Sequence, residues 1–223
     1  MPKQTWTKLD EHKRDRIIQE ALTEFAQYPY AQASITAMVR RLGIAKGSVY
    51  QYFEDKEDLY VAMVHIAHER VHVALRTRIP LALYREADVF TLLRRYFAES
   101  VSVSLDYPVE AALIQRSLYD TSPSAPAVRA LADHIQRSFV EEVVSSAIQS
   151  RSLRDDVDTR VSVFVLESVL ARMIPYMQMH IASDAHATEQ EVTQSAAQIV
   201  RFFDDLVAVL NSGLQARPRE RSS

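Results

Sequence analysis

The chain of 223 residues is 48% hydrophobic, which is enough to bury the core of one large domain or two modest ones. It has no cysteine, which excludes disulfide bonds, thiol chemistry and zinc fingers, and its three glycines disfavour phosphate-binding loops and sheet-and-turn folds. The net charge of −3 conceals an asymmetry, because residues 1–56 carry nine Lys and Arg against seven Asp and Glu and include all five lysines. A basic end on an acidic body favours a domain that faces nucleic acid, although randomly placed lysines would look similar.

The N-terminal residues match neither a signal peptide nor a membrane anchor. Lys3, Lys8, Glu11 and Lys13 occupy positions where a signal peptide has an apolar block. No apolar run approaches the roughly 20 residues that a membrane-spanning helix needs. We therefore expect a soluble, cytoplasmic protein with no membrane partner.

The first expected elements are a longer amphipathic helix over residues 9–27 and a short helix over residues 34–42. In the short helix, Ile35, Met38 and Val39 follow the i, i+3, i+4 spacing that puts apolar side chains on a single face. That face is expected to pack inward.

A second short helix is expected over residues 46–52. Gly43 lies just past the end of the preceding helix, where a left-handed residue is favoured, and therefore marks a tight turn. Val49, Tyr52 and Phe53 then repeat the i, i+3, i+4 spacing. Two short helices at a glycine turn predict a helix-turn-helix, whose second helix lies in the major groove of DNA.

The outward-facing residues of this motif suit DNA rather than catalysis. Lys46 and Lys56 are expected to bind phosphates, and Gln51 can pair with an adenine edge. The full set of expected DNA contacts is Ser34, Thr36, Lys46, Gly47, Ser48, Tyr50, Gln51, Tyr52 and Lys56.

The remainder of the chain shows only helical periodicity, with prolines at the expected helix boundaries. The further helices are expected over residues 56–78, 86–105, 108–120, 125–150, 155–181 and 188–212. The tail over residues 216–223 is expected to fray. The sequence thus predicts an all-α fold of about nine helices.

The last helix carries an apolar seam that advances by four and three residues, formed by Val192, Ala196, Ile199, Phe203, Leu206 and Leu210. The helix over residues 155–181 is similarly apolar. On pattern alone, this surface could be a dimer interface or simply the core of a monomer.

The run from Gly43 to Phe53, followed by Lys56, Glu57 and Leu59, resembles the signature of the TetR family of bacterial transcriptional regulators, roughly Gly-Val-Ser-Lys-Gly-Thr-Leu-Tyr-x-Tyr-Phe-x-x-Lys-Glu-x-Leu. The resemblance covers about residues 10–65. Ala45 departs from it, because the family usually has Ser at the start of the recognition helix. An alanine removes a cap that contributes about 1 kcal/mol.

The resemblance implies a three-helix DNA-binding domain over residues 1–56, with its boundary inside the helix 56–78, and a helical ligand-binding and dimerisation domain over residues 57–215. It implies a homodimer that binds a palindromic operator and is released from it as a repressor by a small, largely apolar effector. The expected effector contacts are Phe97, Val101, Arg116, Tyr119, Phe139, Phe164, Met173 and Met177. The expected dimer contacts are Phe164, Ala171, Ala196, Ile199, Val200, Phe203, Leu206 and Leu210.

Three alternatives stay open at this point. A transcriptional activator, or a helix-turn-helix that contacts protein instead of DNA, would share the motif. An all-helical enzyme is disfavoured, because the chain lacks Gly-rich loops and the His-Glu-x-x-His spacing of metalloenzymes, so we expect no catalytic residue and no cofactor. His65, His68 and His72 share a helix face, but the outer two lie about 10 Å apart along the axis, so we expect no metal site.

Overall fold

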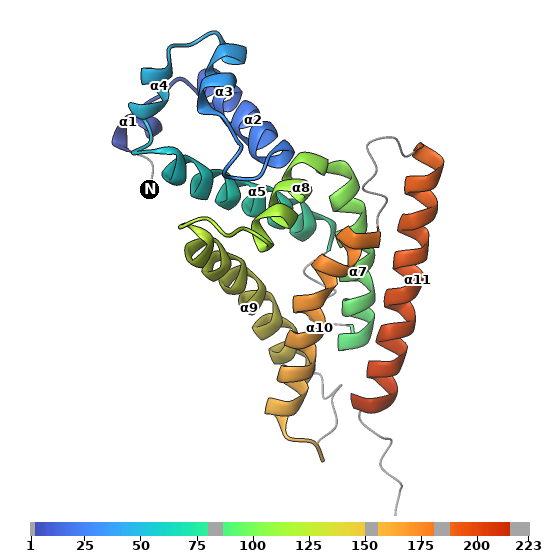
Figure 1. Cartoon of the computed structure of the whole chain (residues 1–223). Helices are drawn as coiled ribbons and strands as arrows, with labels where there is room; N and C mark the ends of the chain where they lie inside the picture. Colours follow the sequence, from blue (N-terminus) through green and yellow to red (C-terminus); the bar gives the residue numbers. More distant parts are fainter. Residues whose placement is uncertain (1–2, 80–86, 150–155, 181–187, 215–223) are drawn as a thin grey trace, which may run out of the picture. The chain divides into compact units, whose positions relative to one another are not determined.

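The structure is a computed structural model that describes residues 3–79, 87–149, 156–180 and 188–214. Within these residues it contains ten helices and no strand, which confirms the all-α prediction (Figure 1). One short helix, α1 (Gln4–Thr7), was not predicted. Every predicted helix is present, with the following bounds: α2 (Glu11–Gln27), α3 (Ile35–Leu42), α4 (Lys46–Tyr50), α5 (Lys56–Arg78), α7 (Val89–Asp106), α8 (Pro108–Leu118), α9 (Ala125–Gln149), α10 (Thr159–His180) and α11 (Glu189–Leu214).

The chain divides into two compact units. Unit 1 comprises residues 1–73 and 104–133, and unit 2 comprises residues 74–103 and 134–223. Helices α5, α7 and α9 each contribute residues to both units. The predicted functional boundary inside α5 stays a prediction, and the predicted frayed tail lies outside the described residues.

Unit 1 has its own hydrophobic core, to which α2, α3, α4, α5 and α8 contribute. Leu22, Met38, Phe53 and Leu59 are fully buried in it. Burial of each such side chain contributes about 1.5–3 kcal/mol. The i, i+3, i+4 positions that the sequence placed on inward faces therefore join α3 and α4 to the same core as α2.

Helix α8 is part of the same unit and is joined to it by polar contacts as well as by packing. An Arg70 guanidinium nitrogen lies 2.8 Å from a carboxylate oxygen of Glu110, which is buried. Arg116 Nε donates to the carbonyl oxygen of Ala26 over 3.1 Å. The second bond satisfies a carbonyl near the C-terminal end of α2, which has no partner within its own helix.

A buried carboxylate joins α2 to α3. Glu24 is 2% exposed, and its Oε1 accepts from the backbone N–H of Ser34 over 2.7 Å. Its Oε2 accepts from Arg41 over 2.6 Å. Because both carboxylate oxygens are paired, the charge is compensated, and Glu24 ties both ends of α3 to α2.

Unit 2 packs aromatic rings between its helices. Phe97 of α7 stacks on Phe203 of α11 with ring centroids 4.6 Å apart, and Tyr176 of α10 stacks on Phe202 at 4.2 Å. Leu166 and Leu170 complete the buried face of α10. None of the helices in the described part of the chain is both long enough and apolar enough to cross a membrane.

Candidate nucleic-acid interface

The turn between α3 and α4 has the geometry that its sequence predicts. Ser34 caps α3, because its Oγ accepts from the backbone N–H of Ala37 over 3.2 Å. Gly43 has φ 68°, a left-handed conformation that glycine adopts without steric cost. Ala45 makes no side-chain cap at the start of α4, as its departure from the family signature predicts. Helix α4 therefore begins without the side-chain bond that usually fixes a recognition helix.

Helix α4 presents one exposed side and buries the other. Lys46, Gly47, Tyr50 and Gln51 are exposed, and Ser48 is half-buried. Their cationic, amide and hydroxyl groups and the bare backbone at the glycine suit phosphate oxygens and base edges. Thr36 of α3 is also exposed, and Ser34 is half-buried at the start of α3.

Tyr52 requires a correction. It is 7% exposed and its ring lies 5.6 Å from that of Trp6, so it packs into the core instead of facing outward. Its expected place among the DNA contacts conflicts with that burial, because a buried ring cannot reach a phosphate without leaving its packing.

The ammonium of Lys56, at the start of α5, contacts a side chain of the protein itself. The Nζ atom lies 4.6 Å from the centroid of the Tyr30 ring, a cation–π distance. Burial lowers the pKa of Lys56, and the Glu24 carboxylate partly opposes that shift. Its phosphate contact stays a prediction, and in this conformation the ammonium is held by Tyr30.

The end of α4 is held by the N-terminal segment, which sequence reasoning missed. The Lys3 ammonium donates to the carbonyl of Tyr50 over 3.1 Å, and Thr5 Oγ1 donates to the carbonyl of Gln51 over 2.7 Å. Trp6, which is 8% exposed, packs its ring 4.9 Å from that of Phe53. These contacts satisfy carbonyls at the C-terminal end of the helix. The one feature of the sequence that could have predicted these contacts is Trp6, the single tryptophan, which lies close to the motif.

Basic side chains surround the two helices. Arg40 and Arg41 lie in the last turn of α3 and are exposed, and Lys46 begins α4. Arg16 donates to the carbonyl of Leu42 over 3.1 Å, which satisfies the end of α3. Because Arg41 pairs with Glu20 and Glu24, the positive charge that would attract duplex DNA comes from Arg40 and Lys46.

The expected effector contacts are divided between the units. Phe97 and Val101 are buried in unit 2, and Phe164 of the same unit is exposed. Arg116 and Tyr119, in contrast, line a cavity of about 660 Å³ in unit 1. The side chains of Phe139, Met173 and Met177 lie outside the described residues. A single pocket formed by all of these residues stays a prediction.

The expected dimer contacts also fall into two groups. Phe164 and Ala171 are exposed on one face of α10, seven residues apart, and Val200 and Leu206 are half-buried. The other expected contacts are buried within their own unit, contrary to expectation, because the seam of α11 faces α7 and α10. These residues are Ala196, Ile199, Phe203 and Leu210.

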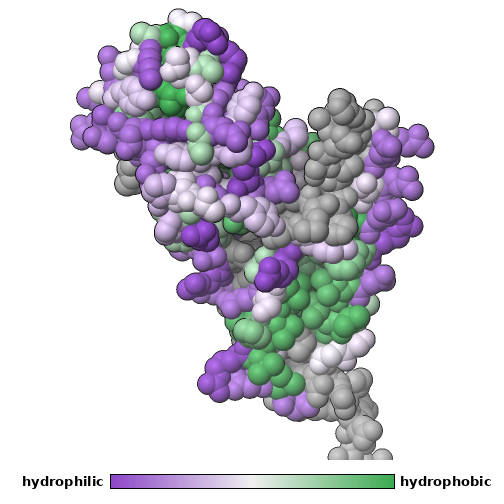
Figure 2. All heavy atoms as spheres, in the orientation of Figure 1, coloured by the Kyte–Doolittle hydropathy of each residue, from purple (hydrophilic) through white to green (hydrophobic). Residues whose placement is uncertain are grey.

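The large apolar side chains that are exposed on α10 and α11 are instead Val161, Phe164, Phe202 and Val209. We call these four residues the α10–α11 patch. On the face drawn in Figure 2, hydrophobic side chains gather over α10 and the adjoining part of α11. Large apolar surfaces of this kind typically mark interaction sites.

The three histidines of α5 have different environments. His65 is exposed and lies 4.0 Å from Glu69, whereas His68 is buried. Burial, together with the nearby His65, lowers the pKa of His68 to about 4, so its ring is neutral near pH 7. His65, His68 and His72 belong to no cluster of three metal-ligating side chains in the described ranges.

The chain is similar to known bacterial regulators in both sequence and structure. The sequence profile of bacterial regulatory proteins of the tetR family matches residues 17–63. A TetR family transcriptional regulator from Chloroflexus aurantiacus J-10-FL is similar in structure, with a TM-score of 0.66 and 28% identity over 97% of this chain and 100% of that chain. The profile match spans α3, α4 and the start of α5, which form the candidate interface.

Two more distant structures share the fold. A putative tetR family transcription regulator from Shewanella sp. PV-4 has a TM-score of 0.62 and 17% identity over 92% of this chain and 99% of that chain. The fatty acid degradation regulator FadR from Bacillus halodurans has a TM-score of 0.62 and 18% identity over 85% of this chain and 96% of that chain.

Proposed function

The chain belongs to the TetR family of bacterial transcriptional regulators, and from this premise we propose that it is a ligand-released repressor that binds a palindromic operator as a homodimer. That it is a DNA-binding regulator follows from the family. The finer proposal is supported by the exposed side of α4, where Lys46, Gly47, Tyr50 and Gln51 project from a helix that is held at its C-terminal end by α1.

The proposed roles of Lys46 and Gln51 can be separated by measuring affinity at several salt concentrations. Operators are first selected from random duplex DNA with the full chain, and affinities are then measured by fluorescence anisotropy. Lys46→Ala is expected to weaken binding to all DNA sequences alike. It should also lower the slope of log affinity against log salt concentration by about one unit, because one phosphate contact is lost. Gln51→Ala is expected to lower the binding free energy for the selected operator by about 1–3 kcal/mol, through the loss of one base-pair contact, and to leave binding to random DNA unchanged.

Two outcomes would contradict these roles. Equal weakening of the selected and random sequences by Gln51→Ala would remove its assigned part in base reading. If the unaltered protein bound no duplex DNA in a salt-dependent way, the helix-turn-helix would serve protein contacts instead. Asp10, which caps α2 through Lys13, lies outside the predicted contact set, and Asp10→Asn is the matched control.

Release by an effector makes a reciprocal prediction. A ligand lowers DNA affinity only by the difference between its affinities for the free and DNA-bound forms. A 100-fold release therefore requires a difference of about 2.7 kcal/mol. We expect an effector found by screening for operator release to bind the operator complex 100-fold more weakly than the free dimer in titration calorimetry. Equal affinity for the two forms would rule out ligand release.

A further inference from the structure

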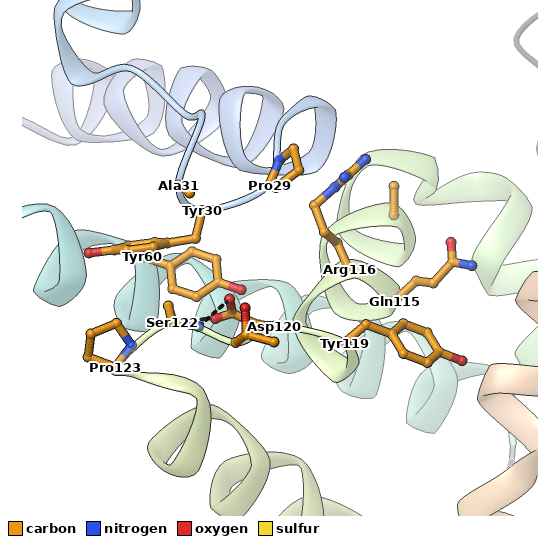
Figure 3. A pocket seen from close by; sticks show the side chains of 12 residues that line it. Pro29, Tyr30, Ala31, Tyr60, Gln115, Arg116, Tyr119, Asp120, Ser122 and Pro123 are labelled. Atoms are coloured by element: carbon orange, nitrogen blue, oxygen red, sulfur yellow. Dashed lines mark hydrogen bonds between the residues drawn. The ribbon is translucent and has the colours of Figure 1, made fainter.

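A cavity in unit 1 is formed by side chains that the proposed DNA contacts do not use. It has a volume of about 660 Å³ and lies between the loop after α2 and the turn after α8 (Figure 3). Volumes of 300–1,000 Å³ are typical of small-molecule sites. Its wall combines the rings of Tyr30 and Tyr60 with the carboxylate of Asp120, so aromatic faces and a negative charge meet in one place.

The Asp120 carboxylate is fixed in position but retains capacity to accept a further bond. Its Oδ1 accepts from the backbone N–H of Ser122 over 2.9 Å, and its Oδ2 accepts from the Ser122 hydroxyl over 2.5 Å. A carboxylate offers about four lone-pair sites, so these two donors leave room for another.

The neighbouring tyrosine adds no competing charge. Burial, and then the Asp120 carboxylate, raise the pKa of Tyr60, so its hydroxyl remains neutral. The negative charge in this part of the cavity therefore belongs to Asp120.

Arg116, the cationic side chain among the described residues that line the cavity, is directed elsewhere. Arg116 Nε donates to the carbonyl oxygen of Ala26, and in Figure 3 its side chain points toward the end of α2, away from Asp120. The Tyr30 ring, on the other hand, already attracts a cation, because the Lys56 ammonium lies 4.6 Å from its centroid. The rings of Tyr30 and Tyr60 are 5.1 Å apart and inclined at 53°.

We propose that this cavity binds a small organic cation with a compact aromatic body, whose ammonium pairs with Asp120 and lies against the ring of Tyr30. An ammonium is attracted both by a carboxylate and by the faces of aromatic rings, and these two interactions reinforce each other where water is partly excluded. A neutral ligand of the same shape gains neither. Arg116 and Tyr119, which line this cavity, are among the expected effector contacts. The cation proposed here is nevertheless a different ligand from the mainly apolar effector, and its binding does not depend on the proposed function.

Titration calorimetry of the full chain without DNA tests the site, with benzylamine as the probe and benzyl alcohol as its neutral counterpart. Benzylamine is expected to bind about tenfold more tightly than benzyl alcohol, which is the gain of one charge-assisted contact. Asp120→Asn is expected to remove this difference. The asparagine oxygen can still accept from the Ser122 N–H, so the turn is kept. Asp133→Asn changes an exposed carboxylate of the same unit and is the matched control.

A second variant tests the site independently in case Asp120→Asn does not fold. Tyr30→Leu retains an apolar side chain but no aromatic face. It is expected to lower the affinity for benzylamine several-fold and to leave the affinity for benzyl alcohol unchanged. Failure of benzylamine to bind, equal affinity for the two probes, or full benzylamine affinity in Asp120→Asn would each overturn the cation site. Because no DNA is present, such a failure is distinct from a failure of the chain to bind an operator, which would overturn the proposed function alone.

Discussion

Replacing Glu24 with alanine is expected to lower the free energy of unfolding by about 3 kcal/mol, because breaking one side of a buried ion pair leaves its partners uncompensated. The Glu24 carboxylate is buried and accepts from Ser34 N–H and from Arg41. Its loss leaves the backbone N–H of Ser34, at the N-cap of α3, without this partner and opens a gap between α2 and α3. Urea denaturation followed by circular dichroism measures the effect.

Glu20→Ala is the matched control for this variant. Glu20 also binds Arg41, over 2.8 Å, but its side chain is partly exposed, as is that of Arg41. Exposed ion pairs contribute about 0–1 kcal/mol, so the control should change the urea midpoint little. If the two alanine variants lost the same stability, the buried carboxylate would not be the connection between α2 and α3 that its geometry indicates.

Substituting aspartate for both Phe164 and Val209 is expected to convert the protein to monomers. These side chains are 68% and 70% exposed and belong to the α10–α11 patch, so each can carry a charge without disturbing the core of unit 2. At a dimer interface, however, the two charges would be buried without partners. Sedimentation velocity measures the oligomeric state.

Operator affinity should fall by about 100-fold or more in the same variant, since two linked half-site readers gain 10²–10⁴-fold over one. Ala208→Asp, on an exposed position of α11 outside the patch, is the control and should stay dimeric. Phe203→Asp would be uninformative, because Phe203 stacks on Phe97 inside unit 2. A doubly substituted protein that remained dimeric would place the interface elsewhere.

The sequence by itself determined the local structure of this protein. Spacing of i, i+3, i+4 located the predicted helices, because a helix has 3.6 residues per turn and must bury one face. Gly43 marked the turn and Ala45 the missing cap, since both depend on one residue's own backbone or side chain. The exposed positions of Lys46 and Gln51 followed from the same periodicity.

Only the tertiary structure decided which neighbour each face meets. Periodicity assigned an apolar stripe to the last helix but could not show that Phe203 packs within its own unit while Phe202 and Val209 remain exposed. That Trp6 packs on Tyr52 was likewise not visible in the periodicity of the sequence. The cavity beside Asp120 joins segments about 90 residues apart, from Tyr30 to Ser122. Contacts between residues so distant in the chain leave no periodic signal, because they depend on how whole helices pack together.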